Sequence, residues 1–329
     1  MNQVAFILEN ATVYWYSVIV ALSVLTGICF FMACCAHVRI SSLWAAVAVL
    51  LSLVLSLVFS RLIYWYCRPE SFPNLLQALT TPASGRFALS GAFAGCALTA
   101  LLLKKPSGDL PKLLDCMSVA GCAAIALGRL GNFFTAFDRG QIMVEMTSLP
   151  WAYPVLNATS GEAEYRLATF MLQAIVAGIL FLVLAGLFFS RWGKRSIPHG
   201  YIALLFLMVY CASQVILDST RYDSLYLRSN GFISIVQILS AIVLVLCIVI
   251  VAIRAVKKLG LQKWMILYWV ILAGLFGLAG YMEYYVQRHG RLAFFSYDIM
   301  EHCLVGILVL GIYLWKISLK LPTKETSDE

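Results

Sequence analysis

One short segment of the chain sets an arginine and an asparagine between glycines. It reads Gly128-Arg129-Leu130-Gly131-Asn132-Phe133. Arg129 and Asn132 are three residues apart and therefore face the same side of a helix. The glycines allow another backbone or a ligand to approach closely. A desolvated guanidinium beside an amide suits a phosphate group held by two hydrogen bonds, so we predict that Arg129, Gly131 and Asn132 bind a phosphate.

A second set of polar residues follows one helical face. Gln214, Asp218 and Arg221 are spaced i, i+4, i+7, which places them on the same side of a helix. Further polar residues or glycines stand near the ends of other apolar segments: Arg61, Ser90, Gly91, Gln237 and Ser240. Two structural alternatives are open here. Arg61 could extend to lipid headgroups, and Asp218 with Arg221 could form an ion pair at a helix end.

Long apolar segments carry these residues. Of 329 residues, 62% are apolar and 12% are charged, against roughly 45–50% and about 25% in soluble domains, which excludes a soluble globular protein. Because a bilayer core takes about 20 apolar residues per helix, we predict an all-α, polytopic transmembrane bundle of about nine spans. The spans cover residues 12–36, 43–66, 87–103, 113–134, 166–190, 200–217, 231–253, 264–286 and 299–318. The third is short and glycine-rich, which fits a re-entrant or broken helix as well as a full span.

The distribution of basic residues predicts the orientation. Alternate loops hold every lysine, and the opposite loops hold arginines with acidic residues. The positive-inside rule then places the N-terminus outside and the C-terminus in the cytoplasm of a bacterial cytoplasmic (inner) membrane. The net charge is +8, but the basic residues lie between apolar runs, which argues against nucleic-acid binding. The polar residues named above all fall at the outer-leaflet level, which predicts a polar chamber open to membrane lipid.

The cysteines and histidines do not predict a metal site. Most of the ten cysteines lie within apolar spans and none forms a C-x-x-C pair, so they are interpreted as small packing residues. Four histidines are scattered over loops and span ends. We therefore expect neither a metal nor a soluble cofactor.

The segment around Arg129 resembles the signature G-R-x-G-N-F-x-N-x-E-x-x-G of the bacterial prolipoprotein diacylglyceryl transferase family. Its first six positions match residues 128–133, and its last glycine matches Gly140. The second asparagine of the signature is Thr135 here, and its glutamate is Phe137, with an aspartate following one residue later.

Other stretches resemble the family in the same order along the chain. Tyr14-Trp15-Tyr16 is similar to the tyrosine-rich first helix, and the segment from Ser60 to Tyr64 is similar to G-x-R-x-x-Y. The family's H-G-G-L-I-G turn corresponds to the segment from Ser90 to Gly95, so its histidine is replaced by serine. Gln237-Ile238-Leu239-Ser240 resembles the Q-x-L-S start of the family's last helix.

The family's Y-G-x-x-R-F-x-x-E-x-x-R block is similar to residues 210–221. Tyr210 and Arg221 are kept, whereas the block's first arginine is Gln214 and its glutamate is Asp218. The resemblance implies a diacylglyceryl-transferase-like domain over residues 1–253. Beyond this domain we expect two additional transmembrane helices in residues 254–320 and a cytoplasmic tail in residues 321–329.

The resemblance implies an enzyme that moves the diacylglyceryl group of phosphatidylglycerol to the lipobox cysteine thiol in a prolipoprotein signal peptide. On this basis Arg129 is expected to clamp the phosphate and Asn132 to orient it by a hydrogen bond. Arg221 with Asp218 is expected to form a gate or a supporting pair, and Tyr210 to contact the headgroup. Because the family histidine is absent, the sequence does not identify the group that activates the acceptor thiol. Three alternatives stay open: the field of the arginines lowers the pKa of the thiol, another group such as Arg61 takes part, or the reaction is lost.

Two other functions stay open. One is a paralogue that binds lipid without transfer or modifies another acceptor. The other is a transporter or assembly subunit, for which Glu283, Asp298, Glu301 and His302 in the added helices would mark an ion path. The structural alternative for those four residues is helix-end pairing with Arg288 and Arg291.

Overall fold

The structure, a computed structural model, describes most of the chain. It covers residues 3–8, 11–81, 87–104, 109–142, 152–156, 161–190, 197–227, 230–260, 262–289 and 293–320. The predicted tail, residues 321–329, and Arg291 lie outside the described residues.

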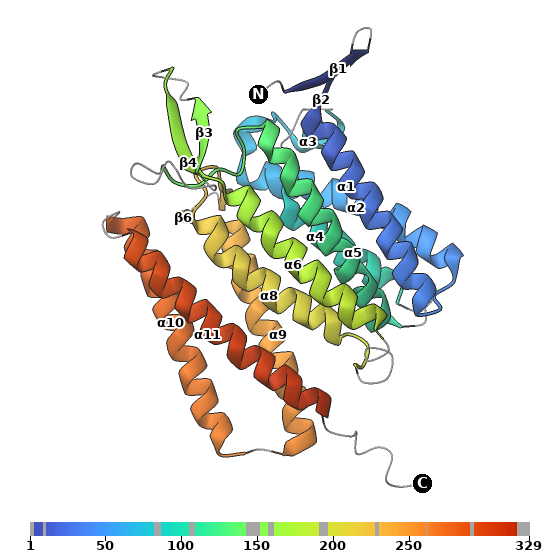
Figure 1. Ribbon diagram of the computed structural model, residues 1–329, viewed down its shortest axis with the longest axis vertical. Coiled ribbons are helices and arrows are strands. Elements are labelled where there is room, and N and C mark those ends of the chain that lie inside the picture. The colour runs from blue at the N-terminus through green and yellow to red at the C-terminus, as the bar shows by residue number, and fades with distance from the viewer. Residues whose placement is uncertain are drawn as a thin grey trace.

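Helices make up the body of the molecule (Figure 1). The α-helices are α1 (Trp15–His37), α2 (Ser42–Cys67), α3 (Leu75–Thr80), α4 (Leu89–Leu102), α5 (Leu110–Leu130), α6 (Thr169–Phe189), α8 (Tyr201–Ser219), α9 (Ile235–Leu259), α10 (Trp264–His289) and α11 (Ala293–Lys320). Two 3₁₀ turns, η1 (Pro69–Ser71) and η2 (Gly131–Phe134), follow α2 and α5.

Eight of the described helices are long and apolar enough to cross a membrane, and α4 is a shorter apolar helix. The prediction of about nine spans is therefore confirmed in part: eight helices are candidates, and α4 lies where the third span, expected to be short and re-entrant or broken, was predicted. The fourteen residues of α4 extend only about 21 Å at 1.5 Å per residue, less than the bilayer core of about 30 Å. The weakest predicted span is thus the one that is too short.

Lipid is the natural covering for the outer helices. Helix α2 is strongly apolar, yet few of its residues are buried inside the protein. Leu43, Leu50 and Val54 of this helix are exposed. Because a helix that is apolar all round needs an apolar environment on every side, these side chains indicate a bilayer.

Three antiparallel hairpins, which the all-α prediction lacked, flank the helices. They are β1 (Val4–Leu8) with β2 (Ala11–Tyr14), β3 (Ala152–Leu156) with β4 (Ala163–Leu167), and β5 (Tyr226–Leu227) with β6 (Asn230–Ser234). They take the residues at which three spans were predicted to begin, so α1, α6 and α9 start a few residues later than expected. The labelled strands lie at the end of the bundle that holds the N-terminus (Figure 1), which we call the hairpin end.

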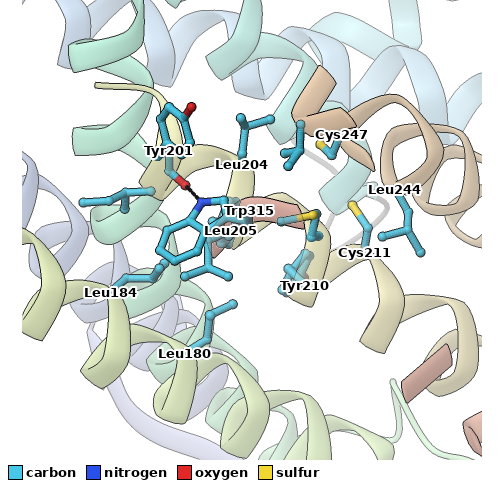
Figure 2. Packing of buried hydrophobic residues seen from close by; sticks show 14 of the residues in the cluster. Leu180, Leu184, Tyr201, Leu204, Leu205, Tyr210, Cys211, Leu244, Cys247 and Trp315 are labelled. Carbon is cyan, nitrogen blue, oxygen red and sulfur yellow. Dashed lines mark hydrogen bonds between the residues drawn. The ribbon is translucent and has the colours of Figure 1, made fainter. Parts of the chain in front are cut away.

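Helix α8 is the centre of the bundle. It contacts α5, α6, α9 and α11, and most of its residues are buried. Figure 2 shows this core, in which the Trp315 indole donates a hydrogen bond of 3.0 Å to the Tyr201 carbonyl oxygen. Helix α8 is therefore packed on several sides, and this packing fixes the position of its last residues at the hairpin end.

Candidate active site

A sharp turn after α5 brings Arg129 and Asp138 together. Helix α5 continues into the 3₁₀ turn η2, where Thr135 donates a hydrogen bond of 3.3 Å from Oγ1 to Asn132 Oδ1. Asp138 then takes a left-handed conformation, with φ of 57°, which few residues other than glycine adopt except Asn and Asp. One oxygen of its carboxylate accepts hydrogen bonds from both Arg129 and Asn132.

The other oxygen of the Asp138 carboxylate pairs with an arginine from a distant part of the chain. Nη2 of Arg221, just beyond α8, lies 2.5 Å from Oδ1. Arg221 also donates from Nη1 to Asp218 and from Nε to Asp223, both at 3.0 Å. Asp223 in turn accepts a hydrogen bond of 2.9 Å from the Asp138 backbone amide, so the two segments are joined twice.

Burial makes the electrostatics of this cluster strong. Burial alone would raise the pKa of Asp138, but Arg129 and Arg221 outweigh it and hold the pKa of that carboxyl below its usual range. Burial would lower the pKa of Arg221, and its three aspartate neighbours instead raise it. Asp138 and Arg221 are therefore both charged at neutral pH, and both guanidiniums of the cluster contact carboxylates.

The two arginines of the cluster differ in how much of the guanidinium is engaged. Arg221 contacts carboxylates through all three of its nitrogens. Arg129 pairs with Asp138 through Nη1, its one ion pair among the residues that the structure describes. Tyr210 of α8 lies beside the same guanidinium. Arg129 is thus the arginine that can accept a further anionic partner with the least rearrangement.

Arg139, which the sequence interpretation did not single out, holds the turn in place. Its side chain is fully buried and donates from Nη2 to the carbonyl oxygens of Asn132 at 2.8 Å and Thr135 at 2.7 Å. The guanidinium carbon lies 4.1 Å from the ring centre of Tyr153 and 4.3 Å from that of Phe170. Cation–π contact on two sides stabilises a charge that is buried away from water.

The structure brings five of the predicted site residues together: Arg129, Asn132, Tyr210, Asp218 and Arg221. Gly131 lies in the same turn, where an added Cβ would lie 3.2 Å from the Tyr16 ring. Gly140 is joined by an isolated β-bridge to Arg221. An added Cβ there would lie 2.7 Å from Leu167 and Thr169, so its role in the structure is close packing.

Other predicted residues have separate surroundings. Arg61 is buried, donates a hydrogen bond of 3.1 Å to the Thr81 carbonyl oxygen, and stacks 4.2 Å from the Phe87 ring centre. It is enclosed by protein rather than extended to headgroups. Ser90 Oγ is buried on α4 and has no hydrogen-bond partner among the described residues. Gly91 packs directly on the α2 backbone.

The two predicted glutamines connect helices. Gln214 accepts a hydrogen bond of 3.0 Å from Gln173 and thereby ties α8 to α6. Gln237 forms a capping box with Ser234 at the start of α9 and donates a hydrogen bond of 3.2 Å to the Val215 carbonyl oxygen of α8. Ser234 also donates to the Asp218 carboxylate, so the cap of α9 reaches the cluster although Gln237 itself is engaged in the cap.

Sequence reasoning missed Asp138 and Asp223 as members of the site. The signal for Asp138 was its position, one residue beyond the glutamate of the family signature. A carboxylate displaced by one position can return to the same place when the backbone turns, and the positive φ of Asp138 provides such a turn. Asp223 carries no comparable signal beyond its spacing of two residues from Arg221.

Among the residues that the structure describes, the acidic side chains of the two added helices form no ion pair with Arg288, and Arg291, the other arginine of that alternative, lies outside them. Glu283 is buried and accepts hydrogen bonds from Ser219 at 2.6 Å and Gln287 at 3.0 Å. Asp298 and His302 form an exposed contact of 3.7 Å on α11. Among the described residues, no group of three or more His, Cys, Asp or Glu side chains is arranged to hold a metal ion.

An apolar groove lies on the outer surface between α1, α5 and α6. It has a volume of about 430 Å³. Leu130, the residue after Arg129 in the sequence, lines it together with Phe30 and Phe181, whereas no residue of the ion cluster is part of its lining. A groove with this lining can take hydrocarbon.

The chain is similar to a known family of membrane enzymes. The family model for prolipoprotein diacylglyceryl transferase matches residues 3–253, which excludes α10 and α11. The chain is 26% identical over 247 residues to the phosphatidylglycerol–prolipoprotein diacylglyceryl transferase of Parasynechococcus marenigrum, covering 71% of this chain and 87% of the relative. It is 25% identical over 248 residues to that of Finegoldia magna (74% and 94%). It is 24% identical over 265 residues to that of Bacillus cereus (79% and 94%).

The family model spans the three segments that meet in the ion cluster: the turn after α5, the end of α8, and the cap of α9, whose Ser234 contacts Asp218. The match also runs through the segments that carry Arg61, Ser90 and Tyr210. From these observations we conclude that the chain belongs to the prolipoprotein diacylglyceryl transferase family.

Proposed function

We propose that this protein transfers the diacylglyceryl group of phosphatidylglycerol to the lipobox cysteine thiol of prolipoproteins. The single observation that carries the proposal is the pairing of Arg129 with the buried Asp138. The site belongs to an ion cluster that also contains Arg221. Family membership supports the same reaction.

The reaction needs a cation where the phosphate departs. The thiol of the acceptor loses its proton to water, its sulfur forms a bond to the terminal glyceryl carbon, and the bond from that carbon to the phosphate oxygen breaks. Glycerol phosphate leaves with the electron pair, so negative charge grows on its oxygen. A preorganised guanidinium stabilises such charge, and Arg129 is positioned for this role. Asn132 would orient the phosphate, and Tyr210 would contact the headgroup.

The Asp138 carboxylate occupies the place beside Arg129 that the phosphate of a bound lipid would take. It engages Arg129 and Arg221 at once, as a phosphodiester with two free oxygens would. A bound lipid would exchange with this carboxylate on Arg129 while Asp218 and Asp223 keep Arg221 in place. Arg221 with Asp218 therefore acts as the supporting pair rather than as the phosphate clamp.

The groove between α1, α5 and α6 would take an acyl chain of the lipid. Its lining is apolar apart from Thr26, and one of its lining residues, Leu130, follows Arg129 in the sequence. In this position the glycerol of the lipid would lie near the cluster, with its acyl chain along α5. The proposed membrane is the bacterial cytoplasmic membrane, with the N-terminus outside, the C-terminus in the cytoplasm and residues 1–253 forming the transferase unit.

A transfer assay with the full chain tests the proposal. The purified protein, phosphatidylglycerol and a lipobox peptide are incubated, and the peptide is examined by mass spectrometry for the gain of one diacylglyceryl unit. Arg129→Ala should reduce the rate at least about 100-fold, as expected when a charge-stabilising donor is removed. Arg288→Ala, at an exposed helix end, is the matched control and should transfer at the wild-type rate.

Failure of the wild-type chain, while the Bacillus cereus relative transfers in the same assay, would overturn the proposal. A second candidate, binding of lipid without transfer, is favoured by the balance of charge in the cluster and by serine at position 90. In that case the protein should retain phosphatidylglycerol through purification, and Arg129→Ala should release it, without any mass gain of the peptide.

A further inference from the structure

The two helices beyond the family match reach the ion cluster through a short series of hydrogen bonds. Ser219, the last residue of α8, donates from Oγ to Glu283 of α10 at 2.6 Å. The carbonyl oxygen of Ser219 accepts a bond of 3.3 Å from the Tyr297 hydroxyl of α11. That hydroxyl accepts from Gln141 Nε2 at 2.9 Å. The helical pair α10–α11 thus holds two separate segments at the hairpin end.

Both segments are neighbours of the cluster. Ser219 directly follows Asp218, which pairs with Arg221. Gln141 directly follows Gly140, which forms a β-bridge with Arg221. A hydrogen bond of 3.1 Å from the Tyr222 amide to the Arg139 carbonyl oxygen joins the same two segments. A shift of either segment would therefore move Arg221 relative to Asp138.

Glu283 is an unusual residue for a helix that only fills space. A carboxyl group within a membrane helix is costly to insert, and an apolar residue would pack α10 without that cost. The Glu283 side chain is buried, and its two oxygens accept one bond from Ser219 and one from Gln287. The carboxyl group is thus bonded to the end of α8, next to Asp218 of the cluster.

We infer that the α10–α11 pair is a clamp that positions the ion cluster, with Glu283 and Tyr297 as positioning residues that act through Ser219 and Gln141. The inference rests on the proposed function for its effect on transfer. Its effect on the structure does not depend on that function. Because a displacement of about 1 Å in a site can cost about 100-fold in rate, a clamp of this kind would change turnover more than lipid binding.

Tyr297→Phe is the central variant, since it removes only the hydroxyl that joins Ser219 to Gln141. Glu283→Leu removes the second contact, and Glu283→Gln, which keeps one acceptor, should restore part of it. Tyr281→Phe is the matched control on α10, because the Tyr281 side chain is exposed on the apolar outer surface. All variants are made in the full chain and compared at the same lipid concentration.

Two readouts separate the clamp from the proposed function. Hydrogen exchange is followed in peptides covering residues 136–142 and 218–224, with residues 113–125 of α5 as the internal reference. Tyr297→Phe should speed exchange in the first two peptides about tenfold and leave the third unchanged. In the transfer assay it should lower kcat about fivefold to tenfold with KM for the lipid within twofold of wild type. Tyr281→Phe should change neither.

Unchanged exchange in the two peptides overturns the clamp, whatever the activity. Faster exchange with a wild-type kcat also overturns it, because the contacts would then only dock the helices. If the wild-type chain transfers nothing, the proposed function fails, and faster exchange in Tyr297→Phe with Tyr281→Phe unchanged still supports the clamp.

Discussion

Arg129 and Asp138 form a largely buried ion pair although nine positions separate them in the sequence. The pair exists because α5 ends in a 3₁₀ turn and Asp138 adopts a positive φ, which returns its carboxylate to the helix it has just left. The carboxylate also contacts Arg221. Asp138 is the one carboxylate paired with Arg129 among the described residues, whereas Arg221 also contacts Asp218 and Asp223, so the effect of removing Asp138 can be measured.

Asp138→Asn should destabilise the protein strongly. The amide would leave the largely buried Arg129 guanidinium without its one described carboxylate partner and would remove one of three carboxylates from Arg221. Removing one member of a buried ion pair costs about 3–5 kcal/mol. Denaturant or thermal unfolding in detergent measures the change in the free energy of unfolding. Inorganic phosphate should stabilise the variant more than the wild type, because the anion can take the place of the lost carboxylate.

The control for this prediction is a pair in the same region with more exposure. Glu164 contacts Arg166 at 2.9 Å on β4, with side chains partly open to solvent. Glu164→Gln should change the free energy of unfolding by less than about 1 kcal/mol, since partly exposed pairs contribute little. Equal stability of Asp138→Asn and Glu164→Gln would contradict the assigned role of Asp138.

Acid should remove the contribution of Asp138 to stability. The two arginines hold the pKa of this carboxyl below its usual value in spite of burial, and that usual value is about 3.9. The unfolded chain therefore binds more protons in this range, so the contribution is present above about pH 4 and is lost as the pH falls through the lower folded-state pKa. Unfolding at pH 7, 5, 4 and 3 should show the gap between wild type and Asp138→Asn closing below about pH 4. A gap that is constant down to pH 3 would show that the carboxyl is not charge-stabilised.

Ser90→Ala should retain transfer within about threefold of wild type. The family histidine is absent at this position, and a serine hydroxyl, whose pKa lies far above 7, is a poor base. Activation of the acceptor thiol then falls to the positive field near Arg129, which lowers the pKa of a thiol brought beside it. The measurement is kcat/KM with the lipobox peptide. A loss of 100-fold or more would instead place the Ser90 hydroxyl in the chemistry, where its buried and unpartnered Oγ would contact substrate.

The helical body was predictable because its signals are local. Each span is a run of apolar residues of known length, and the helices lie within a few residues of the predicted ranges. The hairpins were not predictable in this way. Their strands hold two to five residues each, too few for a clear alternation, and they pair through backbone groups that leave little trace in the side chains.

The site was predictable only in part. Arg129, Asn132 and Arg221 stand in motifs whose spacing is visible in the sequence. Their common partner is not, because Asp138 enters the cluster through a single left-handed residue, and the Asp138 amide bonds to Asp223 across 85 positions. The contacts of Glu283 and Tyr297 cross similar separations. Local patterns place residues on helices and faces, whereas tertiary packing decides which of them meet.

Gly91→Ala should weaken the packing of α4 on α2. A Cβ at this position would overlap the backbone of Phe59 and Ser60, and the same holds one turn later at Gly95, as in other pairs of membrane helices joined through small residues. Overpacking of this kind costs about 1–3 kcal/mol. Gly186→Ala in α6, where nothing lies near an added Cβ, should cause no loss of stability, because alanine is the better helix former. Thermal unfolding of both variants in the same detergent compares them. Equal melting temperatures would contradict the close approach of α2 and α4, and with it the support that this contact gives to Ser90 and Arg61.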